Sequence, residues 1–209
     1  MTTTTPPNPP ALLVFAGSAR NASYNRQLAR EAARMGEAQG ARVTLLELGS
    51  LDIPLYNADL EAAGTPPDVI RLKSILYAHP AWVVCSPEYN GSLTALLKNT
   101  LDWASSPVKG HPEWGDSGTK PFAGKVVGLL SASPGAMGGL RSLGDLAPLL
   151  RNLQCWVAPR QYALGQAAQA FDADGRLRDE RAQTAVQGVV RQVLQAAAAL
   201  HPTNGAPGG

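Results

Sequence analysis

The stretch AWVVCSPEYNGSLTALLKNTLDWA, residues 81–104, combines an apolar run, a polar turn and a helical pattern. Residues 81–85 are apolar without interruption, which predicts a strand buried on both faces. In residues 93–104 apolar side chains return every three or four positions, which predicts a helix. A buried strand that leads into a helix is the unit from which parallel sheets are built.

The same alternation extends over most of the chain. Further strands are predicted at 11–16, 42–48, 125–132 and 155–159, and further helices at 23–40, 69–78, 139–153 and 179–200. Pro148 lies inside one helical pattern, so we expect a kink or an early break there. Five strands that alternate with five helices predict an α/β fold, a doubly wound three-layer sandwich whose five-stranded parallel sheet has the order 2-1-3-4-5.

Length and composition fit one globular domain. The chain has 209 residues, of which 44% are hydrophobic and 16% charged. Residues 1–10 and 202–209 are rich in Thr, Pro and Gly and show no apolar period, so we expect disordered tails around a domain at 11–201.

Charge and motif content argue against several classes of partner. The formal net charge is +2 without any basic block, which gives no reason to expect nucleic acid. We find no signal peptide and no apolar run of membrane-spanning length, so we expect a cytoplasmic protein with no membrane partner. Cys85 and Cys155 lie in apolar runs and are expected to be buried free thiols. The three histidines lack neighbours at useful spacing, so neither a metal site nor a catalytic triad is expected.

Two polar loops follow the first and third predicted strands. In a sheet of this order, ligands bind beyond the carboxyl ends of those strands. The first loop, GSARNASYN at 17–25, precedes a helix whose N-terminus favours an anion. Its short polar side chains and its one arginine suit a phosphate, and they are Ser18, Arg20, Ser23 and Asn25. The alternative is that Ser23 only caps the helix and Arg20 is a surface charge.

The second loop is SPEYNGS, 86–92. Its Asn-Gly pair is a strong hairpin signal, but a helix follows instead of a strand. Gly91 lets the backbone approach a flat ligand closely, although a plain strand-to-helix turn is the alternative. A third loop, SASPGAMGG at 131–139, offers Ser133 as a donor on the same edge. Its glycines are also ordinary turn residues.

Taken in order, the segments GSARNASYNRQLA, SPEYNGSLTALLKNTLDWAS and SASPGAMGGLRS resemble the three signatures of the NADPH-dependent FMN reductase family. This flavodoxin-like group includes chromate, quinone and azo-dye reductases. The similarity covers about residues 11–177, and PEYNGS and LKNTLDW fall at the family's spacing. One departure is Leu93-Thr94-Ala95, where some members carry Pro-Gly.

The resemblance implies a flavodoxin-like fold that binds FMN noncovalently. By matching positions, the FMN phosphate would be held by Ser18, Arg20, Ser23 and Asn25. The isoalloxazine ring would be contacted, largely through backbone groups, by Pro87, Glu88, Tyr89, Asn90 and Gly91, with help from Ser133.

The resemblance also implies an NAD(P)H-dependent oxidoreductase. Hydride would pass from NADPH or NADH through FMN to a small-molecule acceptor such as a quinone, chromate or an azo dye, with no dedicated catalytic acid or base. The family is usually dimeric or tetrameric, which implies a homodimer or homotetramer. Trp103 is then a candidate for the subunit interface or for the core. The long polar loop 105–124 is a candidate to cover the flavin or to shape the substrate site.

Two other functions are compatible with the same fold. One is a flavodoxin-type electron carrier without catalytic activity, and the other is a flavin-free binding protein. Such carriers are typically strongly acidic and use a Thr-rich phosphate loop, whereas this chain is slightly basic. Donors in all three loops argue against a flavin-free protein.

Overall fold

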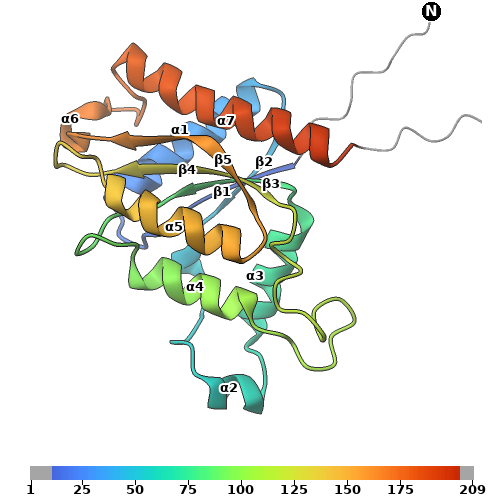
Figure 1. Cartoon of the computed structure of the whole chain (residues 1–209). Coiled ribbons are helices and arrows are strands. Elements are labelled where there is room, and N and C mark those ends of the chain that lie inside the picture. The colour runs from blue at the N-terminus through green and yellow to red at the C-terminus, as the bar shows by residue number, and fades with distance from the viewer. Residues whose placement is uncertain (1–10, 203–209) are drawn as a thin grey trace, which may run out of the picture.

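A computed structural model describes residues 11–202 of the protein (Figure 1). The tails expected at 1–10 and 202–209 lie outside the described residues, apart from Pro202. The strands are β1 (Ala11–Ala16), β2 (Arg42–Leu46), β3 (Ala81–Cys85), β4 (Val126–Ala132) and β5 (Trp156–Leu164). The α-helices are α1 (Tyr24–Ala38), α2 (Ala58–Ala63), α3 (Pro67–Ala78), α4 (Ala95–Ser105), α5 (Leu140–Asn152), α6 (Ala167–Ala170) and α7 (Glu180–Leu200), and a 3-10 turn spans Leu48–Ser50.

The five strands form one parallel sheet in the order β2-β1-β3-β4-β5, which confirms the predicted topology. Val14 of β1 lies opposite Leu45 of β2 and Val83 of β3. At the carboxyl edge Ala16 is paired with Cys85, so β1 and β3 end side by side. The loops that follow these two strands therefore leave the sheet at the same place.

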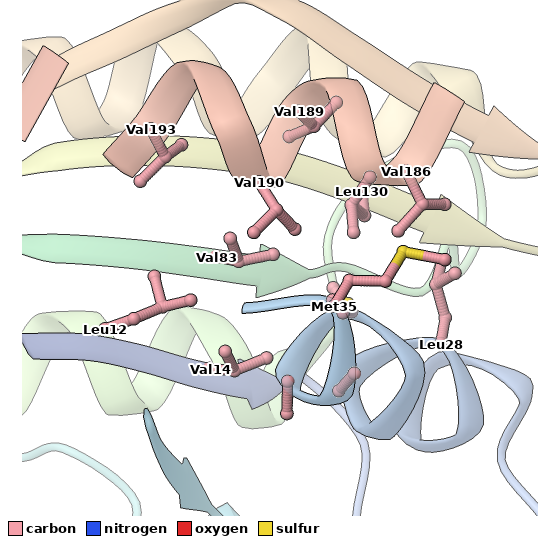
Figure 2. Close-up of a cluster of buried hydrophobic side chains, with 14 of the residues drawn as sticks. Leu12, Val14, Leu28, Met35, Val83, Leu130, Val186, Val189, Val190 and Val193 are labelled. Carbon is pink, nitrogen blue, oxygen red and sulfur yellow. The ribbon is translucent and has the colours of Figure 1, made fainter. Parts of the chain in front are cut away.

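Helices cover both faces of the sheet. Figure 1 shows α1 and α7 on one face and α3, α4 and α5 on the other. Figure 2 shows the first core cluster, in which Met35 of α1 and Val190 of α7 pack over Val83 of the sheet. Alternate side chains such as Leu13 and Phe15 enter the second cluster on the opposite face. The three central strands, β1, β3 and β4, are buried on both faces, and they therefore read as nearly continuous apolar runs.

Helices α2 and α6 were not predicted, and strand β5 is longer than predicted, because apolar periodicity did not mark these segments. Helix α2 buries none of its residues, so it carries no apolar stripe; it begins where the Asn57 side chain accepts the Asp59 N–H at 2.7 Å. Strand β5 continues to Leu164, beyond the predicted end at residue 159. It is an edge strand, and polar residues such as Arg160 and Gln161 ended the apolar run too early.

Helix α5 runs through Pro148 to Asn152, so the expected early break is wrong. A proline inside a helix costs about 3 kcal/mol. Leu143, Leu146 and Leu150 are buried on both sides of it. Burying a leucine stabilises by about 1.5–3 kcal/mol, so packing against the sheet outweighs the cost.

Trp103 belongs to the core, and its reading as an interface residue is wrong. Its side chain is fully buried, and Nε1 donates to the Pro54 carbonyl at 2.8 Å. Cys85 and Cys155 are free and buried, as predicted. Burial raises the pKa of both thiols, that of Cys155 to about 12.

Within residues 11–202, no helix combines the length and apolar character that crossing a membrane requires. The same residues hold no group of three or more His, Cys, Asp or Glu side chains arranged to bind a metal ion.

Candidate functional site

A cavity of about 290 Å³ opens at the carboxyl ends of β1, β3 and β4. It is lined by three loops that are distant in sequence, through Ser18, Arg20, Ser23, Tyr24, Asn25, Pro87, Glu88, Tyr89, Ala132, Ser133 and Pro134. Eight of the ten predicted site residues are in this lining. The other two, Asn90 and Gly91, form the tip of the second loop and lie outside it.

The first loop brings hydroxyl groups to the N-terminus of α1. Ser23 caps the helix through Oγ, which accepts the Arg26 N–H at 3.4 Å. Ser18 Oγ accepts the Arg20 N–H at 3.3 Å, and both serines are buried. Each hydroxyl keeps its own hydrogen for a ligand. Ser23 is thus a cap, as the alternative reading held, without losing its capacity to donate.

Arg20 supplies positive charge at the same place. Its guanidinium carbon lies 5.7 Å from the centre of the Tyr24 ring, a cation–π arrangement, and its side chain is exposed. The first-turn N–H groups of α1 lack partners within the helix and carry its positive dipole end. The loop therefore combines three kinds of group that stabilise an anion.

Asn25 has a structural task that its sequence context did not reveal. Its Nδ2 donates to the carbonyl of Ala132 at 2.8 Å, and its Oδ1 accepts the Ala132 N–H at 3.0 Å. The side chain is buried and joins the start of α1 to the end of β4.

The second loop is a minimal hairpin. Tyr89 and Ser92 exchange backbone hydrogen bonds of 2.9 and 3.1 Å around Asn90 and Gly91. These two residues have φ values of 52° and 85°, the pattern of a type I′ turn, which Asn-Gly favours. The hairpin signal was therefore correct, although only one pair of residues is bridged before α4 begins. Tyr89, which lines the cavity, remains 56% exposed as a residue.

Thr94 ties the first and second loops together. Its Oγ1 donates to the Gly17 carbonyl at 2.6 Å and accepts the Leu97 N–H at 3.2 Å, which caps α4. A Cβ on Gly17 would lie 2.9 Å from Cβ of Leu97, so glycine allows this close approach. Leu93-Thr94-Ala95, where some members of the family carry Pro-Gly, therefore contains the N-cap of α4.

Arg141 and Glu88 join the start of α5, directly after the third loop, to the second loop. The Glu88 carboxylate lies 2.6 Å from Nη2 of Arg141 and accepts the Nε–H of Arg141 at 2.7 Å. Sequence reasoning missed Arg141. One signal was available, because a cation in the first turn of a helix opposes the helix dipole and calls for an acidic partner.

The loop 105–124 lies away from the crevice of its own chain, and its expected role as a cover for the flavin or as part of the substrate site stays a prediction. None of its residues lines the cavity. It follows the end of α4 and packs on α3, where the fully buried Lys73 donates to the carbonyls of Ala104 and Ser106 at 2.6 and 2.7 Å. This places the loop at the edge where the strands begin, opposite the crevice (Figure 1).

The chemistry of these groups fits FMN. A phosphate matches the hydroxyls, the helix N-terminus and Arg20, and a flat ring matches the wall formed by Pro87 and the Tyr89 turn. Ser133, whose Oγ accepts the Gly135 N–H at 3.2 Å, keeps a hydroxyl hydrogen on the other side of the cavity.

Comparisons with known proteins, by sequence and by structure, find flavin-dependent reductases. The family model for NADPH-dependent FMN reductase matches residues 10–169. An NAD(P)H-dependent FMN reductase of Pseudomonas aeruginosa is 37% identical over 186 residues, which cover 88% of this chain and 91% of the relative. A quinone reductase of Pseudomonas putida is 33% identical over 172 residues, 81% and 86% of the two chains. The solved flavoenzyme FerB of Paracoccus denitrificans, an NAD(P)H:(acceptor) oxidoreductase, superposes with a TM-score of 0.76 at 29% identity, and covers 90% of this chain and 97% of its own.

Proposed function

This chain belongs to the NADPH-dependent FMN reductase family, and from that premise we propose that it transfers two electrons from NAD(P)H to a small-molecule acceptor through bound FMN. The acceptor class we propose is a quinone, chromate, an azo dye or a similar compound, of which the quinone is supported by the name of a relative. The observation that carries the proposal is the meeting of three loops, from β1, β3 and β4, at one crevice with phosphate-binding chemistry.

Each loop would have a separate task in holding the cofactor. Ser18, Ser23 and the first-turn N–H groups of α1 would bind the phosphate, and Arg20 would neutralise its charge. Asn25 has one amide hydrogen left for the phosphate after its two bonds to Ala132. The ring would lie against the second loop, and the residues proposed to contact it are Pro87, Glu88, Tyr89, Asn90, Gly91 and, from the third loop, Ser133.

FMN, when bound, supplies the two-electron redox chemistry. The protein's contribution is to bind and orient the ring and to leave one side open to the nicotinamide and then to the acceptor. Tyr89 lines the cavity and is exposed, which supports a role for it in contacting either molecule.

We also propose a homodimer or homotetramer in the cytoplasm. Of the five large apolar residues that are more than half exposed in the described part of the chain, three gather near the Glu88–Arg141 pair, and a subunit interface would cover them: Tyr89, Met137 and Leu140. The two free cysteines fit a reducing compartment. Light scattering on the eluting protein measures the assembly, and a monomer at micromolar concentration would contradict it.

The decisive experiment is spectroscopic. The purified protein should show bound FMN, lose its flavin absorbance on addition of NADPH or NADH under anaerobic conditions, and regain it on addition of a quinone. Protein that stays colourless after incubation with FMN would overturn the proposal. Reduction by a partner reductase, but by neither nicotinamide, would indicate an electron carrier instead.

A further inference from the structure

Among residues 11–202, one residue holds the Glu88 carboxylate: Arg141, at the start of α5. Oε1 of Glu88 accepts the Nε–H of Arg141 at 2.7 Å, and Oε2 accepts the backbone N–H of Arg141 at 3.1 Å. The Glu88 side chain is only 10% exposed, whereas that of Arg141 is 65% exposed. Arg141 therefore donates the hydrogen bonds that replace water around the nearly buried Glu88 carboxylate.

The start of α5 also lies close to the end of β3, where the second loop begins. Ser142 Oγ is within hydrogen-bond distance of two carbonyl oxygens, that of Gly139 at 2.8 Å and that of Ser86 at 3.1 Å, so its one hydrogen is shared between them. Gly139, directly before α5, has a φ of 87°, and a Cβ there would lie 2.5 Å from Oγ of Ser131 and in ordinary contact, 3.4 Å, with Cβ of Glu88. Glycine therefore suits the backbone conformation and the close packing on Ser131 at the point where α5 begins.

The dipole of α5 acts with opposite sign on the two charges of the pair. The N-terminus of α5 favours the carboxylate and disfavours the guanidinium, so Arg141 is favourable at this position through its contact with Glu88. Without Arg141, a carboxylate that lines the crevice would lose two of its donors. Because an unpaired buried charge is costly, the second loop would move to expose it.

We propose that Arg141 is a positioning residue: it holds Glu88, and through Glu88 the segment 86–91, in the shape that receives the isoalloxazine ring before FMN binds. The inference rests on the proposed function for the identity of the ligand, but the ordering of the loop concerns the protein alone.

The first test therefore uses protein without flavin. Amide hydrogen exchange over residues 86–92 is compared among the wild type, Arg141→Met and Arg151→Met. Arg151 is exposed in the last turn of the same helix and serves as the matched loss of one positive charge. We expect about tenfold faster exchange in Arg141→Met alone, as for a segment that has lost part of its local stability. Equal exchange in all three proteins would overturn the proposal.

The second test measures FMN affinity by fluorescence quenching and ring geometry by visible circular dichroism. Arg141→Met should weaken binding about tenfold and alter the dichroism, with Arg141→Lys intermediate because lysine keeps the charge but loses the fork. Glu88→Gln should weaken binding similarly, and the double variant should be no weaker than either single one. Additive losses would overturn the pairing. If the wild type itself bound no FMN, the proposed function would fail, and the exchange experiment would still decide the role of Arg141.

Discussion

Asn25 and Ala132 are joined by two hydrogen bonds, one in each direction, between the first residues of α1 and the last residue of β4. The side-chain amide pairs with the backbone N–H and C=O of Ala132, as a neighbouring strand would, at the point where β4 ends. It fixes the N-terminus of α1 relative to the start of the third loop, so two walls of the crevice are held at a set distance.

Asn25→Ala should destabilise the protein. The substitution leaves the N–H and C=O of Ala132 without their buried partner, and one unsatisfied buried group costs about 1–3 kcal/mol. We expect a loss of about 2–3 kcal/mol in the free energy of unfolding, measured with urea. Asn152→Ala removes the same side chain from an exposed position at the end of α5 and should cost far less. Equal losses in the two variants would contradict the structural role of Asn25.

Arg20→Ala should weaken FMN binding about tenfold, because a charge-assisted contact to the phosphate is lost. The effect should shrink as salt is added, since the side chain is exposed and its charge is screened. Isothermal titration of flavin-free protein measures both quantities. Arg191→Ala, an exposed change on α7, should leave the affinity unchanged. An affinity for riboflavin that falls as much as that for FMN would show that Arg20 does not act on the phosphate.

Gly91→Ala should change the flavin environment through backbone strain. A methyl group there meets no atom within 4 Å, but φ is 85°, and left-handed backbone costs an L-residue about 1–2 kcal/mol. Gly40→Ala is a matched control, because Gly40 has a φ of 82° with equally open surroundings at the end of α1. Both variants should lose similar stability, and only Gly91→Ala should shift the visible flavin spectrum and lower turnover. A spectral shift in Gly40→Ala as well would rule out a local effect.

Stability should depend on pH through Lys73. Burial lowers the pKa of this amine to about 8, below its unfolded value. Between pH 8 and about 10.4 the unfolded chain binds more protons than the folded one, so stability rises with pH in this window. We expect the free energy of unfolding of the wild type, minus that of Lys73→Met, to be flat below pH 8 and to increase above it. Taking the difference cancels the opposite contribution of the two buried thiols. A difference that falls above pH 8 would contradict this.

Sequence reasoning was most reliable where a local pattern suffices. The strand bounds at 11–16 and 81–85 match the structure, because both strands are buried on two faces and leave unbroken apolar runs. It was weakest where no apolar face exists, as in α2, and where packing overrides a local signal, as at Pro148.

For the crevice, the sequence by itself determined which residues gather, because parallel strands of known order bring Ser18, Arg20, Pro87 and Ser133 to one edge. Only the tertiary structure decided how they are held. The partners of Asn25 and Glu88 lie 107 and 53 positions away, and the loop 105–124 packs at the opposite end of the sheet. Such contacts depend on the geometry of packed elements in three dimensions, and no spacing along the chain encodes them.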